Sequence, residues 1–424
     1  MMERKLKAIF IGAGNRGLVY SKQMASLPEK YEGVAVAEPL DSRRNHVKER
    51  FDLPEDRCFT DWRDLLKLGK IADLAVIATM DKDHLEPALA AIDLGYDLLL
   101  EKPVAPNAAD CETIAKRAQE KGAKVLVCHV LRYTPFFTTI KKLLSDGVIG
   151  EICSIDHREH VEIVHQSHSF VRGRWGNAGR SSCMLLQKSC HDLDILQWLI
   201  GKKCLKIQSF GGLHYFTREN MPEGAPERCI DGCPYGETCI FNSVKLYLQS
   251  KSEWFRGACT GVVNPTNEQV EQALRTTQYG KCVYQCDNDV VDRQTVNMLF
   301  EDGITVTFSM NAFNKGGRHI HIFGTKGELW GSMDSREEPV RVRDFYTNQI
   351  TEYPVTGKDG LESGHGGGDR GIVEALHGYI CGTYKGFSAS DVRVSVDNHH
   401  LVFAAEKSRL EGTVVTLEDY INSL

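Results

Sequence analysis

The stretch GAGNRG, residues 12–17, decides how the rest of this chain is interpreted. It follows a short apolar run and opens a segment with helical periodicity. In a strand–turn–helix unit, Gly12 permits a tight turn, Gly14 lets a pyrophosphate approach the backbone, and Gly17 lets the helix lie close to the sheet. The helix N-terminus adds N–H donors and a partial positive charge. The stretch therefore predicts a dinucleotide-binding turn.

The sequence after this turn supports the same prediction. A second apolar run, residues 33–37, ends in Glu38 about 20 residues after the glycines, where an acidic side chain accepts ribose hydroxyls. An ordinary glycine turn with a surface glutamate is the alternative, but strand, glycines, helix and acid stand in the expected order. A carboxylate here also repels a 2′-phosphate, which predicts NAD as the cofactor. Arg43 and Arg44 could instead pair with that phosphate, so NADP stays an alternative.

Residues 5–129 alternate between apolar strand-like runs and helical periods. We predict strands at residues 7–11, 34–38, 73–79, 97–100 and 124–130, and helices at residues 15–27, 42–51, 83–94 and 108–121. Runs this apolar need cover on both faces, which indicates a parallel sheet with crossover helices. Residues 1–129 are therefore predicted to form a Rossmann dinucleotide-binding domain. Its ligand edge, beyond the carboxyl ends of the strands, would carry residues 12–17, Glu38, residues 79–81 and residues 101–103.

From about residue 130 the pattern changes. We expect a helix at residues 135–144, strands at residues 152–163, 204–215, 281–287, 295–300, 304–310 and 319–323, and closing helices at residues 371–381 and 396–410. Residues 220–240 are rich in Pro, Gly and Cys, which predicts a long loop. Strand-rich sequence with few crossover helices indicates an α+β domain over residues 130–424, built on a mixed or antiparallel sheet.

The composition is that of an ordinary globular protein. The chain has 424 residues, 42% apolar and 25% charged, and its length exceeds what one hydrophobic core usually serves. A net charge of −6 provides no basic field for nucleic acid or an anionic membrane. No apolar segment approaches the length of a membrane span, and the N-terminal apolar run is too short for a signal peptide. The 14 scattered cysteines then indicate reduced thiols and a cytoplasmic location.

Two short motifs carry groups that can transfer a proton. Lys102 follows the fifth predicted strand and can polarise a substrate hydroxyl or carry its proton; a solvated pair of Lys102 with Glu101 is the alternative. His191 stands near the start of an apolar helical run. Asp194, three residues later, shares its helix face and could orient the imidazole, and Lys188 stands one turn earlier. A structural histidine is the alternative.

These motifs give the chain a family resemblance. It resembles the Gfo/Idh/MocA oxidoreductases, named after glucose–fructose oxidoreductase and inositol dehydrogenase, in GAGNRG, VAVAEP, the long segment that ends in EKP, HVLRYTPFF, CHDLDIL, FGTKGELWG and EKSRLEGTVVTL. The resemblance spans nearly the whole chain. It implies a C-terminal domain whose open, mostly antiparallel sheet carries the substrate site and forms a homo-oligomer. It also implies a tightly held nicotinamide cofactor that exchanges hydride with a carbon bearing a sugar or polyol hydroxyl.

Carried over by position, the resemblance implies roles for individual residues. Lys102 would be the catalytic lysine and His191 the catalytic histidine, while Tyr133, Gln187 and Lys188 would contact the substrate. The residues expected beside the cofactor are Gly12, Gly14, Asn15, Arg16, Gly17, Glu38, Arg43, Thr79, His84, Glu101 and Lys102. Many members have an aspartate where this chain has Gln187. The usual Asp–His–Lys group is therefore incomplete, and we expect a rearranged proton relay.

The resemblance implies two alternative functions. The first is an NAD(P)-dependent oxidoreductase that acts on the CH–OH group of a sugar, polyol or related hydroxy compound. The second is a glycoside-cleaving enzyme that retains its NAD, oxidises the sugar transiently, eliminates a substituent and reduces the sugar again. A protein that only senses a nucleotide is disfavoured, because both Lys102 and His191 are present. Neither function involves nucleic acid or a membrane.

A cysteine group in the predicted loop leaves one question open. Cys229, Cys233 and Cys239 could hold zinc with Cys259 or His214 as a fourth ligand. The spacing fits no common zinc motif, however, so free thiols are favoured and we expect no metal.

Two further patterns are ambiguous. The histidines His157, His160, His165 and His168 either line the substrate face or form a polar strand edge. The glycines of GHGGGD, residues 364–369, indicate either a close approach of the backbone to a ligand or a flexible linker.

Overall fold

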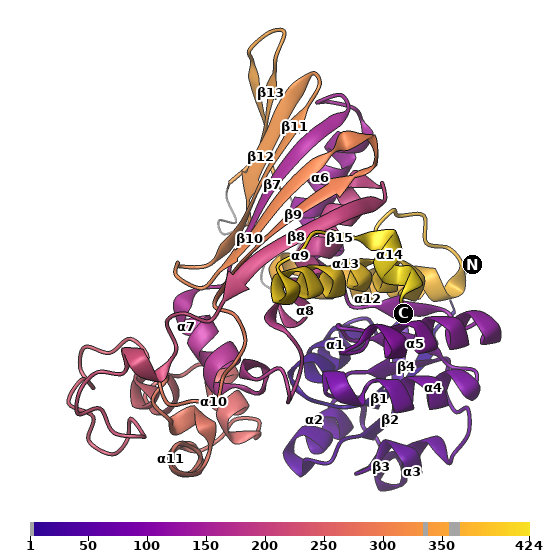
Figure 1. Cartoon of the computed structure of the whole chain (residues 1–424). Helices are drawn as coiled ribbons and strands as arrows, with labels where there is room; N and C mark the ends of the chain where they lie inside the picture. The colour runs from indigo at the N-terminus through magenta and orange to yellow at the C-terminus, as the bar shows by residue number, and fades with distance from the viewer. Residues whose placement is uncertain (1–3, 334–337, 356–364) are drawn as a thin grey trace.

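A six-stranded parallel sheet forms the centre of the N-terminal part of the chain (Figure 1). The computed structural model describes residues 4–333, 338–355 and 365–424, and its first sheet has the order β3-β2-β1-β4-β5-β6. The strands are Leu6–Ile11 (β1), Tyr31–Ala37 (β2), Cys58–Phe59 (β3), Leu74–Ile77 (β4), Asp97–Leu100 (β5) and Val125–Val127 (β6). The chain runs outward from β1 to β3 and returns to β4 beside β1. The point where ligands bind in such sheets therefore lies at the ends of β1 and β4.

Helices cover both faces of this sheet. They are Asn15–Ala25 (α1), Asp41–Phe51 (α2), Trp62–Leu66 (α3), Leu85–Asp93 (α4) and Ala108–Lys121 (α5). Side chains of α3, α4 and α5 share one apolar cluster with the sheet, and those of α1 and α2 share another. This confirms the predicted Rossmann architecture. The elements β3 and α3 were not predicted, because they have only 2 and 5 residues. The strand β6 is shorter than predicted, since the chain turns into the 3-10 helix Val130–Tyr133 (η3).

A nine-stranded sheet forms the centre of the C-terminal part, in the order β14-β13-β12-β11-β7-β10-β9-β8-β15. Its strands are Ile152–His160 (β7), Cys204–Gly212 (β8), Arg293–Phe300 (β9), Thr305–Asn311 (β10), Gly317–Gly324 (β11), Gly327–Ser332 (β12), Val340–Asp344 (β13), Ile350–Tyr353 (β14) and Val415–Thr416 (β15). The strands β7 and β10 pair in parallel, and the other described pairs are antiparallel. The expected open, mostly antiparallel sheet is therefore confirmed, with β12, β13, β14 and β15 as unpredicted strands.

The strand predicted at residues 281–287 is wrong. This segment forms turns, with one isolated bridge between Lys281 and Arg228. Val283 and Tyr284 are neighbours in sequence and both are buried in one apolar cluster. A strand would point neighbouring side chains to opposite faces. Burial of both side chains in the same cluster therefore favours a compact turn over an extended strand.

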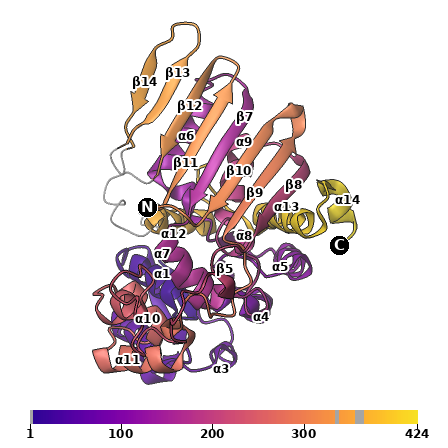
Figure 2. The same cartoon turned by 60° about the vertical axis from the view of Figure 1, so that its left-hand side comes forward.

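Helices cover one face of the nine-stranded sheet. Pro135–Ser145 (α6), Cys190–Ile200 (α9) and Val392–Glu411 (α13) contribute to the large apolar cluster formed with the strands. Figures 1 and 2 show the opposite face of the sheet without a covering helix among the described residues. The short helices Met184–Gln187 (α8) and Leu417–Asn422 (α14) complete this region. The last turn of α8 leads directly into α9, which brings residues 187–191 toward the Rossmann domain.

The C-terminal region also packs on the Rossmann domain. The helix Gly368–Cys381 (α12) contributes Ile372, Val373, Leu376 and Ile380 to the apolar cluster of β1 and α1. Val392 and Val396 of α13 join the cluster on the other face. The hydrophobic core is thus continuous across the boundary predicted at residues 129 and 130.

A helical lobe lies between β8 and β9 in the sequence and beside the Rossmann domain in space (Figures 1 and 2). It contains a π-helix, Val244–Leu248 (η7), and the helices Glu253–Thr260 (α10) and Asn267–Thr276 (α11). The predicted loop at residues 220–240 is confirmed, since it consists of turns and the isolated bridge at Arg228. The helix Ile163–Ser167 (α7) and the π-helix His168–Arg172 (η4) join β7 to this lobe. None of the helices in the described ranges has the length and hydropathy that a membrane crossing requires.

Candidate active site

A cavity of about 490 Å³ lies where the Rossmann domain, the lobe and the C-terminal sheet meet. On the Rossmann side it is lined by Gly14, Asn15, Arg16, Arg43, Thr79, Asp81, His84, Glu101 and Lys102. On the opposite side it is lined by His165, His168, Phe170, Trp175, Gln187, Lys188, His191, Trp254, Arg318 and His365. The structure thus brings most of the predicted site residues to one cavity, together with several that sequence patterns did not identify.

The glycine turn is shaped by close backbone contacts. Gly12 has a φ of +87°, and a Cβ atom there would lie 2.5 Å from the carbonyl oxygen of Ala78. A Cβ atom on Gly17 would lie 2.2 Å from the carbonyl oxygen of Gly12. Neither glycine lines the cavity, so both shape the turn instead of contacting a ligand. Gly14 does line the cavity, and α1 begins there without a side-chain cap. Its N-terminal N–H groups therefore fit a phosphate.

Glu38 is buried behind this turn. Its Oε2 accepts a 2.7 Å hydrogen bond from the backbone N–H of Ala13, and its Oε1 accepts a 3.1 Å bond from the N–H of Leu40. Arg43 lines the cavity, whereas Arg44 donates to the carbonyl oxygen of Glu38. The carboxylate thus fixes the glycine turn, and its contact with a ribose stays a prediction.

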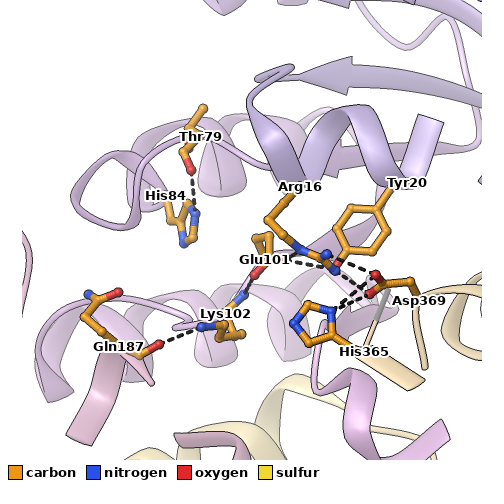
Figure 3. A network of polar contacts seen from close by, with 9 residues as sticks. All are labelled: Arg16, Tyr20, Thr79, His84, Glu101, Lys102, Gln187, His365 and Asp369. Carbon is orange, nitrogen blue, oxygen red and sulfur yellow. Dashed lines mark hydrogen bonds and ion pairs between the residues drawn. The ribbon is translucent and has the colours of Figure 1, made fainter. Parts of the chain in front are cut away.

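Glu101 links the glycine helix to the catalytic candidate Lys102 (Figure 3). Its Oε1 accepts 2.7 Å and 2.8 Å hydrogen bonds from Arg16 Nε and the Tyr20 hydroxyl, and its Oε2 accepts a 2.6 Å bond from the backbone N–H of Lys102. Burial alone would raise the pKa of Glu101, but the charges of Arg16 and Lys102 outweigh it and lower the pKa. Glu101 is therefore ionised, and its hydrogen bonds stabilise the turn that carries Lys102.

His84 connects two neighbouring turns at the ligand edge. Its Nδ1 lies 2.9 Å from the carbonyl oxygen of Pro103, and its Nε2 lies 3.3 Å from that of Thr79. These carbonyl groups follow β5 and β4. His84 therefore holds together the two strand ends that flank the cavity, which fits its predicted place beside the cofactor.

His191 lines the cavity but lacks the carboxylate partner that its spacing predicted. The carboxylate of Asp194 accepts two 2.7 Å hydrogen bonds from Arg132. The predicted pairing of His191 with Asp194 is therefore wrong, because the buried guanidinium of Arg132 requires that charge. Among the described residues, Nδ1 of His191 has no hydrogen-bond partner. Burial, together with the charge of Lys102, lowers the pKa of His191 well below its ordinary value, so the imidazole is neutral.

Gln187 stands at the position where the family resemblance led us to expect an aspartate. Its Nε2 donates to the carboxylate of Asp81 and to Ser182 Oγ, the latter at 2.6 Å. Ser181 Oγ also donates to Asp81 Oδ2 at 2.6 Å. Asp81 itself lines the cavity. Position 187 thus carries an amide, and the carboxylate at this side of the cavity is that of Asp81, which follows β4.

Lys188 and Arg318 form the charged wall opposite the Rossmann domain. Lys188 Nζ lies 3.2 Å from Glu159 Oε1, and Arg318 Nε lies 2.8 Å from Glu159 Oε2 and 2.9 Å from Asp192 Oδ1. Burial lowers the pKa of Lys188, and the charge of Glu159 offsets part of this effect. Arg318 belongs to β11, more than a hundred residues after the histidine motif, so no local pattern indicated it.

Tyr133 does not reach the cavity. Its buried hydroxyl lies 3.2 Å from Ser390 Oγ and accepts a bond from the N–H of Ser390. It therefore joins η3 to the start of α13, and the structure does not support its expected contact with substrate.

The four histidines of the strand-like run separate into two pairs. His165 and His168 line the cavity, with ring centroids 5.0 Å and 4.6 Å from that of Trp254. His157 instead contacts Asp192 at 2.9 Å within the core, and His160 packs beside a histidine of β11. Only the second pair in sequence therefore faces the cavity.

The cysteines of the loop gather around a small separate cavity. Cys229, Cys233 and Cys239 line it with Cys282 and the buried Arg172. They are free thiols. Cys259, which the sequence offered as a fourth ligand, belongs to a different apolar cluster, and His214 does not line the cavity. Within the described ranges, no group of three or more His, Cys, Asp or Glu side chains is arranged to hold a metal ion.

The glycine segment before α12 approaches protein backbone. Gly364 lies outside the described residues. A Cβ atom on Gly368 would lie 2.3 Å from the carbonyl oxygen of Val130, and one on Gly371 would lie 2.7 Å from that of Tyr133. Gly368 of the predicted segment, together with Gly371 beyond it, therefore lets α12 pack on η3. His365, in the same segment, does line the cavity.

Comparison with known proteins adds independent findings. Residues 6–129 match the model of an oxidoreductase family with an NAD-binding Rossmann fold, and residues 141–417 match its C-terminal alpha/beta domain. The Bacillus subtilis protein YteT is 26% identical over 326 residues, which cover 74% of this chain and 73% of that protein. Inositol 2-dehydrogenase of Salmonella typhimurium is 23% identical over 218 residues, covering 51% of this chain and 59% of that enzyme.

A third relative and a solved structure extend the comparison. The 2,7-anhydro-N-acetylneuraminate hydratase of Escherichia coli is 28% identical over 149 residues, covering 35% of this chain and 39% of that protein. The structure of scyllo-inositol dehydrogenase from Lactobacillus casei with NAD(H) and scyllo-inositol superposes with a TM-score of 0.66 at 15% identity, covering 98% of this chain and 100% of that one. At this identity the superposition shows a shared fold.

Proposed function

Because the chain belongs to the Gfo/Idh/MocA oxidoreductase family, we propose that it transfers hydride between NAD and a carbon bearing a hydroxyl in a sugar, polyol or related hydroxy compound. The observation that carries this proposal is that Lys102 and His191, from different domains, line one cavity with the glycine turn at Gly14. Inositol dehydrogenases among the relatives support the substrate class.

The residues around the glycine turn fit a bound dinucleotide. The open N-terminus of α1 at Gly14 would receive the pyrophosphate. Arg43, which lines the cavity, and Glu38, which is buried behind the turn, would contact the adenosine ribose. Thr79 and His84 would line the path toward Lys102. When bound, the nicotinamide ring supplies hydride transfer. We propose NAD over NADP, because Glu38 disfavours a 2′-phosphate.

Lys102 and His191 are proposed to act on the reacting oxygen. Hydride can leave a carbinol carbon only as the hydroxyl proton is taken up, so a base must come within hydrogen-bond reach of that oxygen. The neutral imidazole of His191 can accept this proton. The ammonium group of Lys102 would stabilise negative charge that develops on the oxygen. Gln187 and Lys188 would bind neighbouring hydroxyl groups.

An aromatic wall supports a carbohydrate substrate. Phe170, Trp175 and Trp254 line the cavity, and the two tryptophans are 39% and 37% exposed. Aromatic faces carry partial negative charge, which attracts the weakly positive C–H face of a sugar ring. The wall therefore provides an apolar platform opposite the polar groups of the Rossmann domain.

The proposal is tested by absorbance at 340 nm with purified protein, NAD, and a panel of inositols, free sugars and aryl glycosides. Net formation of NADH with a free sugar or polyol is the expected result. Release of an aglycone at catalytic NAD, without accumulation of NADH, would instead favour the NAD-retaining glycoside-cleaving alternative. No reaction with any member of the panel would contradict both.

We also propose a homo-oligomer formed through the open face of the nine-stranded sheet. The strands β9 and β10 alternate buried and exposed side chains, and Phe210 on β8 is 57% exposed. Light scattering coupled to gel filtration tests this, and a monomer at micromolar concentration would contradict it. The cytoplasmic location stays a prediction.

A further inference from the structure

The cavity contains a histidine–carboxylate pair, but it lies at the start of α12 and not on α9. Nδ1 of His365 is 3.2 Å from both carboxylate oxygens of Asp369 (Figure 3). His365 lines the cavity, and its ring centroid lies 6.1 Å from that of His191. The pair is thus placed beside the catalytic candidates of the proposed function.

The pair fixes the tautomer of His365. Arg16 donates two hydrogen bonds to the Asp369 carboxylate, from Nη2 to Oδ1 at 2.6 Å and from Nη1 to Oδ2 at 3.2 Å. Burial alone would raise the pKa of Asp369, but the His365 hydrogen bond and the Arg16 charge lower it to about 2. An ionised carboxylate only accepts hydrogen bonds, so Nδ1 of His365 must carry the proton. In a neutral ring, Nε2 then keeps a free lone pair.

His365 is better connected to solvent than His191. The side chain of His365 is 39% exposed. His191 is 5% exposed and has no carboxylate partner among the residues that the structure describes. Partial desolvation of the ring within the cavity lowers the pKa of His365 despite the neighbouring Asp369, so the ring is neutral near pH 7. A neutral ring with a fixed tautomer and an exposed edge is suited to take up a proton and release it to water.

We propose that His365, oriented by Asp369, is a second acid–base residue of this site. Its Nε2 accepts the proton of a substrate hydroxyl: the O–H bond breaks, an N–H bond forms, and the electron pair stays on the oxygen. In the reverse direction the same nitrogen returns the proton. The resulting imidazolium is stabilised by Asp369 and exchanges its proton with solvent. This inference rests on the proposed function, because it places the substrate in the same cavity.

The position of Arg16 couples this pair to the cofactor side. Arg16 belongs to the first turn of α1 and also donates to Glu101 at 2.7 Å. One guanidinium therefore fixes the carboxylate behind His365 and the carboxylate beneath Lys102. His365 and Lys102 are thus both supported by Arg16, which follows the glycine turn.

Substitution to glycine gives a specific test, because His365 has a φ of +54°, a conformation that glycine adopts without strain. We expect His365→Gly to lower kcat by about 10²-fold or more, with the dissociation constant for NAD unchanged. Added imidazole should restore a substantial part of the lost turnover. The matched control His214→Gly, outside the cavity, should keep wild-type kcat. Turnover of His365→Gly within threefold of wild type, or a loss that imidazole does not restore, would overturn the proposal.

A second measurement does not depend on turnover. In protein labelled with 15N-histidine, the resonances absent from His365→Gly should show a proton on Nδ1 and a free Nε2 at pH 7. A proton on Nε2 instead would overturn the proposal even if the enzyme is active. Failure of the proposed function would appear separately, as absence of NADH formation by the wild-type protein with every sugar and polyol. In that case the position of the proton on the His365 ring would still test the proposed role of His365.

Discussion

The Nζ atom of Lys102 donates a 2.6 Å hydrogen bond to the backbone carbonyl oxygen of Gln187. The bond joins the end of β5 in the Rossmann domain to the turn that precedes α9, which carries His191. The group that is proposed to act on the substrate therefore also contacts the segment that leads to His191. The ammonium group has three N–H donors, so a bound substrate oxygen could accept a hydrogen bond from one of the other two.

The first prediction concerns Lys102 and His191. We expect Lys102→Met and His191→Ala each to lower turnover by about 10²-fold or more, because each removes a group that acts on the reacting oxygen. The dissociation constant for NAD, measured by fluorescence titration, should change little for His191→Ala. Near-wild-type turnover of His191→Ala would show that His365 alone handles the proton.

The second prediction concerns the choice of cofactor. Glu38 should make NAD bind at least about tenfold more tightly than NADP, because its carboxylate disfavours a 2′-phosphate. Glu38→Ser should narrow this difference, and it should also weaken NAD binding because Ala13 loses its hydrogen-bond acceptor. Isothermal titration with both nucleotides measures the ratio. Tighter binding of NADP by the wild-type protein would show that Arg43 and Arg44 determine the preference.

The third prediction concerns the pair of Gln187 and Asp81. Gln187→Glu keeps the shape of the side chain but places a second carboxylate against Asp81, where the amide now donates a hydrogen bond. We expect a lower Tm at pH 8 than for the wild type, and a smaller difference at pH 5, where one carboxyl can be protonated. Differential scanning calorimetry at the two pH values measures this. Equal Tm values for Gln187→Glu and the wild type at pH 8 would contradict a buried contact between residue 187 and Asp81.

The fourth prediction concerns the aromatic wall. Trp254→Ala should raise KM for a sugar substrate by about 2- to 10-fold while kcat changes less, because stacking contributes binding of about 0.5–1.5 kcal/mol. Trp254→Phe keeps an aromatic face and should retain most of the affinity. If both variants behave like the wild type, the substrate does not contact this wall.

The fifth prediction concerns stability in acid. Burial lowers the pKa of His168 and of His399 to about 3, below the value of about 6.5 in an unfolded chain. Below pH 6.5 the unfolded state therefore binds more protons than the folded state, and stability falls as pH falls toward 3. Each histidine contributes up to about 1.4 kcal/mol per pH unit.

This dependence is measured by thermal melting between pH 8 and pH 5. We expect His399→Gln to reduce the change in Tm over this range, because the side chain no longer titrates. The control His214→Gln, in an exposed loop position, should leave the change as in the wild type. A Tm of the wild-type protein that is constant from pH 8 to pH 5 would contradict the prediction.

The sequence alone determined the Rossmann fold, the second sheet and the ligand edge. The glycine turn at residues 12–17, the strand β5 and the helix α5 follow from short-range properties: hydrophobic period, glycine conformation and capping by Asn107, whose side chain accepts from the N–H of Asp110. The strand predicted at residues 281–287 was wrong, because apolar content alone does not distinguish a strand from a buried turn.

Only the tertiary structure decided how charges are paired in the cavity. The spacing of His191 and Asp194 indicated a pair, yet Asp194 binds Arg132. Among the described residues that line the cavity, the histidine paired with a carboxylate is His365. Arg16 and Asp369 stand 353 residues apart in the chain, so no local pattern connects them. The physical reason is that a buried charge is expensive unless it is paired. The oppositely charged residue that pairs with a buried charge depends on how distant elements pack, and therefore on the folded structure.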